Sequence, residues 1–520
     1  MKLNDASLKN TQPWLTRGFR LPKYDRAAIR EQTKKAPAWV HLGAGNIFRA
    51  FLCAVADDLL DNGLCDTGIV VAEGFDEELI DKAYRPFDAL SVLATLKSTG
   101  SVEKRVLGSV VEALNVAGGS GPEWERLKEI FANPSLQMAS FTITEKGYAF
   151  TSDASLMGKT AALCLHRYQN GATPLALVSM DNCSHNGEKL RSAVLEIADR
   201  WVKEGRAEPG FLSYLADESK VSFPWTMIDK ITPRPDESVQ AMLKDAGFED
   251  ADVIITAKRT YTAAFVNAEE AQYLVVEDRF PGGRPPLHLG GVLFADRDTV
   301  NLTEKMKVGT CLNPLHTALA VLGCLLGYTS IHAEMKDEDL KRLVHHLGHV
   351  EGMPVVADPG IIRPADFLNE VLNVRFPNPF LPDTPQRIAT DTSQKLPIRF
   401  GETLKAYRQR PDLNLKSLTG IPLVFAAWLR YLTGIGDDGK PFEVSPDPLL
   451  SKLQPVLANV ALGDKGPFHS LLSPILSDDS LFGVNLYEAG LGEKVEVLFA
   501  QMISAPGAVR RVLHETVSSF

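Results

Sequence analysis

A buried strand that runs into a glycine turn and then into a helix constrains the fold of this chain more than any other feature. The apolar run at residues 38–42 predicts the strand, Gly43 and Gly45 end it, and apolar periodicity over residues 47–60 predicts the helix. Gly43 permits a tight turn, and Gly45 lets backbone N–H groups approach a phosphate at the positive end of the helix. The unit is typical of nucleotide-binding sheets, although the motif alone also fits an ordinary strand-to-helix turn.

Strands and helices continue to alternate along the first half of the chain, which is typical of a parallel sheet. The predicted elements lie at residues 68–72, 122–131, 136–144, 175–180 and 187–204. Beyond about residue 306 helical patterns dominate, at residues 315–326, 337–347, 423–432 and 449–462. We therefore predict the α/β class, with a Rossmann-type N-terminal domain built on a parallel sheet over residues 1–300 and a mostly α-helical C-terminal domain over residues 301–520.

An acidic residue at the end of the second predicted strand indicates which nucleotide the turn binds. Glu73 occupies the place of the carboxylate that binds the adenosine ribose in dinucleotide-binding domains, and it would repel the 2′-phosphate of NADP. We therefore predict NAD as the cofactor. Asp76 is the competing candidate for this contact, and a solvated turn acid is the alternative interpretation of both. The predicted cofactor-binding residues are Gly43, Gly45, Asn46, Phe48, Arg49 and Glu73, with Phe48 at the position of the third fingerprint glycine.

A lysine, an amide and an imidazole are concentrated just before an apolar helix in the second half of the chain. Oxidation of an alcohol needs a base for the hydroxyl proton and donors for the developing oxyanion. Lys307 could be the base, Asn313 an oxyanion donor and His316 a partner for a substrate hydroxyl. Lys305 is an alternative base, and a solvated lysine before an Asn-Pro helix start is the alternative interpretation of the segment.

Charge and composition exclude several classes of function. The net charge of −10 is spread without a basic block, so we expect no nucleic-acid partner. The first residues lack the apolar run of a signal peptide, and the longest apolar stretch is too short and interrupted to span a bilayer, so we expect no membrane contact. Six scattered cysteines without a CxxC pair favour a reducing cytoplasm over a disulfide framework.

A pair of histidines offers the pattern that most suggests a metal. His345 and His349 are four residues apart and would share one face of a helix, as zinc ligands can. No thiolate or HExxH pattern accompanies them, Gly348 weakens the helix, and histidines near helix ends commonly interact with the helix dipole. We therefore predict no metal.

Six segments in a fixed order make the chain resemble the polyol-specific long-chain dehydrogenases, the family of mannitol dehydrogenase and fructuronate (D-mannonate) reductase. They are HLGAGNIFRAF at the glycine turn, TITEKGY at residues 142–148, SMDNCSHNG at 179–187, FPWTMIDKITP at 223–233, the segment 307–316, and RFPNP through RIATDTSQK at 375–395. The resemblance covers most of the chain. It implies metal-independent, NAD-dependent exchange between a secondary alcohol and a ketone.

The resemblance also implies roles for individual residues. Lys307, Asn313 and His316 match the family's catalytic lysine, asparagine and histidine, although Asn313 follows Lys307 by six residues where the family has five. Asn182 matches a second oxyanion donor. Trp225 and Lys230 depart from the asparagine and arginine that the family often has. The residues that match the family's proton-relay acids and substrate-binding groups are Glu145, Glu304, Asp229, Arg387 and Lys395.

Positive charge near the predicted site favours a sugar acid as the substrate. A carboxylate needs a cationic clamp, and more positive charge than a neutral polyol requires comes from Arg375, Arg387, Lys395 and Arg399. We therefore expect an NAD-dependent oxidoreductase that interconverts D-mannonate and D-fructuronate, with mannitol and fructose, or tagaturonate, as alternative substrates. A non-catalytic nucleotide-binding regulator is the alternative of another class, but it would have no use for the lysine, asparagine and histidine in one segment. The oligomeric state stays open.

Overall fold

A six-stranded parallel sheet lies at the centre of the N-terminal half in the computed structural model, which describes residues 1–458 and 460–520. The strand order is β6-β3-β2-β7-β8-β9, so the chain starts in the middle at β2, builds one edge and then crosses back to build the other. In open α/β sheets, ligands bind at the carboxyl ends of the strands at such a reversal. The strands are β2 (Trp39–Leu42), β3 (Ile69–Glu73), β6 (Val110–Asn115), β7 (Met138–Phe141), β8 (Leu175–Ser179) and β9 (Val221–Ser222).

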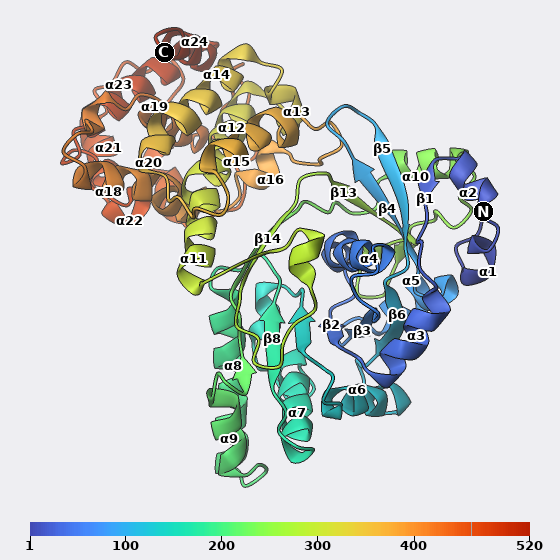
Figure 1. Ribbon diagram of the computed structural model, residues 1–520. Helices are drawn as coiled ribbons and strands as arrows, with labels where there is room; N and C mark the ends of the chain where they lie inside the picture. The colour runs from blue at the N-terminus through green and yellow to red at the C-terminus, as the bar shows by residue number, and fades with distance from the viewer. Residues whose placement is uncertain (459) are drawn as a thin grey trace. The chain divides into compact units, whose positions relative to one another are not determined.

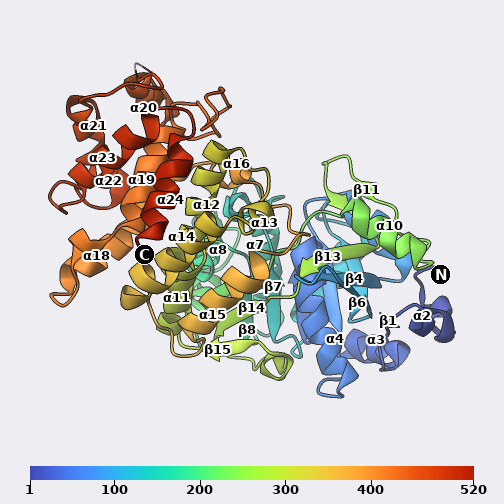
Figure 2. The ribbon, with the colours of Figure 1, turned by 90° about the horizontal axis from the view of Figure 1, so that it is seen from above.

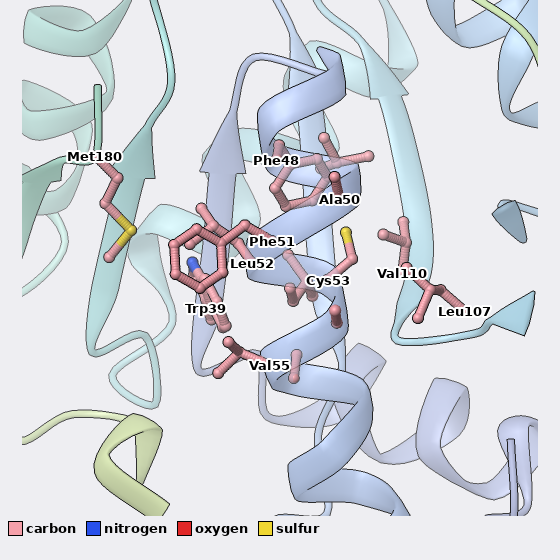
Figure 3. Packing of buried hydrophobic residues seen from close by; sticks show 14 of the residues in the cluster. Trp39, Phe48, Ala50, Phe51, Leu52, Cys53, Val55, Leu107, Val110 and Met180 are labelled. Carbon is pink, nitrogen blue, oxygen red and sulfur yellow. The ribbon is translucent and has the colours of Figure 1, made fainter. Parts of the chain in front are cut away.

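Alternate residues of the central strands enter two separate hydrophobic cores. Trp39 belongs to the core that contains η1 (Phe48–Leu52) and α4 (Cys53–Asp61), whose packed side chains are drawn in Figure 3. Val40 and Leu42 belong to the other core. Because both faces of the sheet are covered, its strands have continuous apolar sequences. Four helices contribute to the second core and contact one another in sequence order (Figure 1): α6 (Pro122–Ala132), α7 (Leu156–Gln169), α8 (Asn186–Lys203) and α9 (Pro209–Ala216).

Two smaller sheets and a hairpin complete the first of two compact units, Met1–Asn301. The smaller sheets have the orders β1-β5-β4-β13 and β10-β14-β15, and the hairpin pairs β11 with β12. Their strands are β1 (Phe19–Arg20), β4 (Ser91–Leu96), β5 (Val102–Leu107), β10 (Thr226–Asp229), β11 (Ile254–Ile255), β12 (Tyr261–Thr262), β13 (Phe265–Glu269), β14 (Tyr273–Glu277) and β15 (Leu293–Ala295). The remaining helices of this unit are α1 (Asp5–Leu8), α2 (Gln12–Thr16), α3 (Arg26–Lys35), α5 (Glu77–Ala83), η2 (Arg85–Phe87), η3 (Glu145–Tyr148), α10 (Glu237–Asp245) and η4 (Leu287–Gly290).

Helices build the second unit, Leu302–Phe520, which the chain enters within α11 (Arg297–Met306). Its helix α19 (Gly420–Tyr431) is buried along its whole length and packs against α12 (Asn313–Leu326) and α23 (Gly492–Ile503) (Figure 2). The other helices are η5 (Lys307–Cys311), α13 (Ile331–Glu334), α14 (Glu338–His346), η6 (Leu347–Gly352), η7 (Met353–Val355), α15 (Pro364–Glu370), η8 (Val371–Arg375), α16 (Pro385–Ile388), α17 (Thr392–Leu396), η9 (Pro397–Gly401), α18 (Glu402–Gln409), η10 (Leu415–Ser417), α20 (Leu450–Leu457), α21 (His469–Leu476), α22 (Asp479–Phe482) and α24 (Ala508–Ser518).

The predicted class is confirmed, because a parallel α/β sheet precedes a mostly helical half. Three local predictions differ from the structure. The helix predicted over residues 47–60 begins with the π-helical turn η1, and the strand predicted over residues 136–144 is limited to β7. The helix predicted over residues 449–462 begins at Leu450 and ends at Leu457, with Pro455 inside it.

One helical stretch, Arg297–Leu326, is long and apolar enough to cross a membrane by length and composition alone. Of its most apolar 18-residue window, 78% is buried inside the protein. Burial of this kind is that of a core helix, so the stretch gives no support to a membrane span.

Candidate active site

The two glycines of the turn after β2 have different structural reasons for being glycine. Gly43 has a φ of 111°, and a Cβ there would lie 2.7 Å from the carbonyl oxygen of Thr142, which follows β7. Its N–H donates to the carbonyl of Ala72 at 2.9 Å. A Cβ at Gly45, in contrast, would meet nothing within 4 Å. The fold itself therefore requires glycine at the first position, whereas the open space at the second is where a ligand could approach the backbone.

The Glu73 carboxylate fastens the glycine turn to the end of β3. Its Oε2 accepts the N–H of Ala44 at 2.8 Å, and its Oε1 accepts the N–H groups of Phe75 at 2.7 Å and Asp76 at 3.1 Å. Tyr84 donates its hydroxyl to the carbonyl of Ala44 at 2.8 Å. The predicted ribose acid thus lies beside the turn, and two oxygens that can accept about four hydrogen bonds retain capacity for one ligand hydroxyl.

Phe48 and Arg49, predicted to lie beside the cofactor, are instead buried and support the turn from within. Phe48 replaces the third glycine, and its ring stacks on His41 with 4.1 Å between ring centroids. Arg49 donates to Thr262 Oγ1 at 2.9 Å and to the carbonyl of Ala263 at 2.7 Å. These side chains are 0% and 1% exposed, so neither presents a surface to a ligand. Asn46 is half-buried on the turn itself.

An aromatic residue that the sequence interpretation missed stands at the end of β3. Phe75 is 67% exposed, and the ammonium of Lys258 lies 4.3 Å from its ring centroid. The loop that carries Lys258 is fixed by Thr256 and Thr260, whose hydroxyls each donate to Asp76 Oδ2 at 2.6 Å. Asp76, the alternative candidate for the ribose contact, is 2% exposed and accepts hydrogen bonds from this loop. The detectable signal was a large apolar side chain two residues after the strand-ending acid.

The carboxyl ends of β7 and β8 carry two of the predicted residues. Glu145 begins η3 after β7, is exposed and forms an ion pair with Lys189, which lowers the pKa of its carboxyl. Asn182 is exposed just after β8. The preceding Asp181 is buried and accepts hydrogen bonds from Tyr148 and from Ser179, the latter at 2.9 Å. Because β7 and β8 are parallel neighbours, Glu145 and Asn182 lie at the same edge of the sheet as the glycine turn.

The three-stranded sheet places Asp229 and the two residues that depart from the family pattern. Asp229 ends β10, opposite Tyr273 of β14, and is 7% exposed. The ammonium of Lys230 donates to the carbonyl of Glu269 at 2.9 Å. Trp225 stacks on His185 with 4.4 Å between ring centroids. The substitutions at residues 225 and 230 are therefore accommodated by contacts inside the first unit.

Lys307 and Asn313 flank a widened helical turn in the second unit. Lys307 begins the π-helical turn η5 and is 4% exposed, whereas the alternative base Lys305 is exposed. The N–H of Leu312 donates to the carbonyl of Lys307 at 3.1 Å, a hydrogen bond that spans five residues. A π-type turn holds one residue more than an α-helical turn. The extra residue between Lys307 and Asn313 is thus taken up by η5, and Glu304 lies half-buried one turn before Lys307.

His316 lies on α12 in a strongly positive environment. Its Nε2 is 3.5 Å from Asp383 Oδ2, and its ring centroid is 5.1 Å from that of Phe376. Burial lowers the pKa of His316 to about 3, and the charges of four cations add to the effect: Arg399, Arg387, Arg375 and Lys395. The imidazole is therefore neutral at physiological pH and can donate or accept a hydrogen bond. Asp383, which sequence reasoning missed, carries no motif that would have identified it.

The cations near His316 are held in different ways. Arg387 forms an ion pair with Asp383, and its side chain is 64% exposed. Lys395 donates to the carbonyl of Ile388 at 3.0 Å, and burial lowers the pKa of its ammonium to about 8. Arg375 is 2% exposed. Arg399 donates from Nη1 to Thr317 Oγ1 at 2.6 Å.

The histidine pair considered for a metal lies at the end of α14 and in η6. The ring centroids of His345 and His349 are 5.8 Å apart. Over residues 1–458 and 460–520, no group of three histidine, cysteine, aspartate or glutamate side chains is placed to hold a metal ion.

The strand order and the glycine turn define a Rossmann-type fold in the first unit, and helices build the second unit. The chain belongs to the mannitol dehydrogenase family: residues 37–289 match the mannitol dehydrogenase Rossmann domain, and residues 300–490 match the mannitol dehydrogenase C-terminal domain. The resemblance seen in the six sequence segments is thereby confirmed, and the chain is an oxidoreductase of this family.

Individual relatives match over nearly the whole chain. The D-mannonate oxidoreductase of Thermotoga maritima is 53% identical over 99% of this chain and 99% of its own. A mannitol dehydrogenase of Saccharomyces cerevisiae is 28% identical over 93% of each chain. The structure of Pseudomonas fluorescens mannitol 2-dehydrogenase in complex with NAD and D-mannitol matches with a TM-score of 0.70 and 25% identity over 100% of both chains.

Proposed function

We propose that this chain is an NAD-dependent dehydrogenase that interconverts D-mannonate and D-fructuronate without a metal. The observation that carries the proposal is the group of four cations around the neutral His316. A neutral polyol cannot form ion pairs with these cations, whereas the carboxylate of a sugar acid can. The full-length similarity to a D-mannonate oxidoreductase supports the same substrate.

The residues of the glycine turn fit a dinucleotide. The open space at Gly45 suits a pyrophosphate at the start of η1, with the N–H groups of Gly45 and Asn46 as candidate donors. Glu73 at the end of β3 would bind the adenosine ribose diol, and its charge would favour NAD over NADP. A related enzyme has been solved with NAD. Bound NAD would supply the acceptor for the hydride that leaves the carbinol carbon.

The protein groups would manage the proton and the oxygen of the reacting alcohol. We assign Lys307 as the base, because it is buried on η5 while its neighbour Lys305 is exposed. The side-chain amides of Asn182 and Asn313 would donate to the oxyanion, and the neutral His316 would hold a substrate hydroxyl. Further assignments are Glu145 and Glu304 to proton relay, and Asp229, Arg375, Arg387 and Lys395 to substrate binding.

Mannitol and fructose are the rival substrate pair, because several of the similar proteins are mannitol dehydrogenases. Tagaturonate is a second rival that also carries a carboxylate. All six cysteines are free, which supports the proposal that the enzyme works in the reducing cytoplasm.

A spectrophotometric assay of NADH oxidation tests the proposal directly. The purified protein should reduce D-fructuronate with a higher kcat/KM than D-tagaturonate or D-fructose. Lys307→Ala should lower kcat by about 10²- to 10⁴-fold with unchanged NADH binding, whereas the exposed neighbour variant Lys305→Ala should retain activity. Turnover of fructose alone would refute the sugar-acid substrate, and near-normal turnover by Lys307→Ala would refute the assignment of the base.

A further inference from the structure

Arg399 lies against the helical face that carries two of the predicted catalytic residues. It belongs to the π-helical turn η9, which packs against η5. Its Nη1 donates to Thr317 Oγ1 at 2.6 Å and to the carbonyl of Asn313 at 3.3 Å. Asn313, His316 and Thr317 stand at positions i, i+3 and i+4 of α12, so they share one face of this helix. The guanidinium of Arg399 is therefore held beside the groups that would contact the substrate.

The positive charge of Arg399 has no counter-ion within the described part of the chain. Arg387, in contrast, forms an ion pair with Asp383. The carboxylates of Asp391 and Asp447 lie near Lys395 and oppose part of the fall in its pKa that burial causes. Burial lowers the pKa of Arg399 to about 10, and no carboxylate opposes that shift. A partly buried, uncompensated charge costs folding free energy, and a bound anion would remove that cost.

Most of the hydrogen-bonding capacity of this guanidinium is also unused. A guanidinium has five N–H donors, and among the described residues only Nη1 of Arg399 has partners. Nε and Nη2 remain, and this pair can bind the two oxygens of one carboxylate side by side. We propose that Arg399 binds the carboxylate of the substrate and so determines the preference for a sugar acid over a neutral polyol.

The proposal rests on the proposed function, because it assigns a binding partner to one end of that substrate. Fructuronate and fructose share the ketone and differ at the far end of the chain, where a carboxylate replaces a hydroxymethyl group. A residue that recognises only this end changes the relative use of the two ketones. A residue that only supports α12 would change both reactions alike.

The test compares fructuronate and fructose in Arg399→Gln, which removes the charge but keeps a polar side chain at this position. We expect kcat/KM for fructuronate to fall about 10- to 100-fold, mainly through KM, because a charge-assisted bond is lost. The value for fructose should change less than about threefold, within the range of a peripheral contact. Arg399→Lys should retain part of the preference, since it keeps the charge but loses the paired geometry. Arg408→Gln, an exposed change on α18, is the matched control and should behave like the wild type.

Inhibition of fructuronate reduction by D-mannitol provides a second measurement that does not depend on fructose turnover. The inhibition constant of this neutral ligand should be nearly the same in the wild type and Arg399→Gln. Equal losses for fructuronate and fructose, or equal weakening of fructuronate and mannitol, would overturn the role of Arg399. Wild-type activity with fructose but not with fructuronate would instead overturn the proposed substrate.

Discussion

The two glycines of the turn after β2 should respond oppositely to the same small change. In Gly43→Ala the new Cβ would stand 2.7 Å from the carbonyl oxygen of Thr142, and the φ of 111° is strained for any L-residue with a side chain. Positive φ alone costs about 1–2 kcal/mol. For a domain of this size each kcal/mol corresponds to about 2–4 °C. Gly43→Ala should therefore lower Tm by roughly 2–8 °C, and by more if the contact with Thr142 is not relieved.

Gly45→Ala should leave the stability of the protein unchanged and weaken the binding of the cofactor. Its Cβ would meet nothing within 4 Å, so no contact of the protein opposes it. The methyl group would occupy the space through which a pyrophosphate approaches the backbone. Loss of one charge-assisted hydrogen bond costs about 1.5–3 kcal/mol. The Kd of NADH should therefore rise about 10- to 150-fold.

Two measurements separate these effects. Thermal unfolding without cofactor reports on the fold, and titration of NADH fluorescence reports on binding. The reasoning fails if Gly45→Ala binds NADH like the wild type, because the open space would then not face the cofactor. It also fails if Gly43→Ala is as stable as the wild type, because the approach of Thr142 would then not require glycine.

Two further predictions concern a buried acid and an exposed ring. Glu334 is 0% exposed, and burial raises the pKa of its carboxyl to about 9. As pH rises, the carboxyl therefore loses its proton in the unfolded chain before it does so in the folded protein. Wild-type stability falls as pH rises from 4.5 to 9 for this reason. At pH 7 the raised pKa of Glu334 lowers the unfolding free energy of the wild type by about 3 kcal/mol. The Tm of Glu334→Gln should therefore fall less between pH 5 and 8 than that of the wild type. Parallel curves of Tm against pH for the two proteins would contradict this. Phe75→Ala should raise the Kd of NADH about 5- to 100-fold, because an aromatic ring at the end of β3 can stack on adenine. Reduced nicotinamide mononucleotide, which lacks adenine, should bind unchanged, and equal weakening of both ligands would exclude this role.

Four strands of the central sheet, β2, β3, β7 and β8, could be predicted from the sequence because their signals are local. Each is a short apolar run next to a turn or a helix, and their parallel direction follows from the alternation with helices. The edge strands β6 and β9 were not predicted. The smaller sheets could not be predicted in this way. β4 (Ser91–Leu96) pairs with β13 (Phe265–Glu269), which lies about 170 residues further along the chain. No local pattern indicates such a partner.

The sequence could name candidate site residues but not the direction of their side chains. The motif that named Gly43 and Glu73 also named Phe48 and Arg49, yet the last two are directed into the fold. Their burial depends on contacts with His41, Thr262 and Ala263, which the fold alone brings near. The sequence interpretation missed Phe75 because only the folded chain shows that this apolar side chain is exposed.

Widened helical turns are the feature of the site that sequence patterns describe least. Among the described residues five helical stretches contain π-type turns, although such turns account for well under 1% of residues in ordinary proteins. Three of them carry Lys307, Arg375 and Arg399. π-type turns often mark functional sites, because one added residue redirects a side chain without ending the helix. Side-chain propensities do not show where a helix will widen.

The spacing between Lys307 and Asn313 shows what such a turn accomplishes. In a regular α-helix one additional residue would rotate Asn313 and His316 by about 100° relative to Lys307. The hydrogen bond from Leu312 to the carbonyl of Lys307 closes the wider turn η5, so the added residue is absorbed before α12 begins. The lysine can then keep its angular relation to the asparagine and histidine despite the longer segment. The departure from the family's spacing therefore has a structural explanation that leaves the assignment of Lys307 consistent.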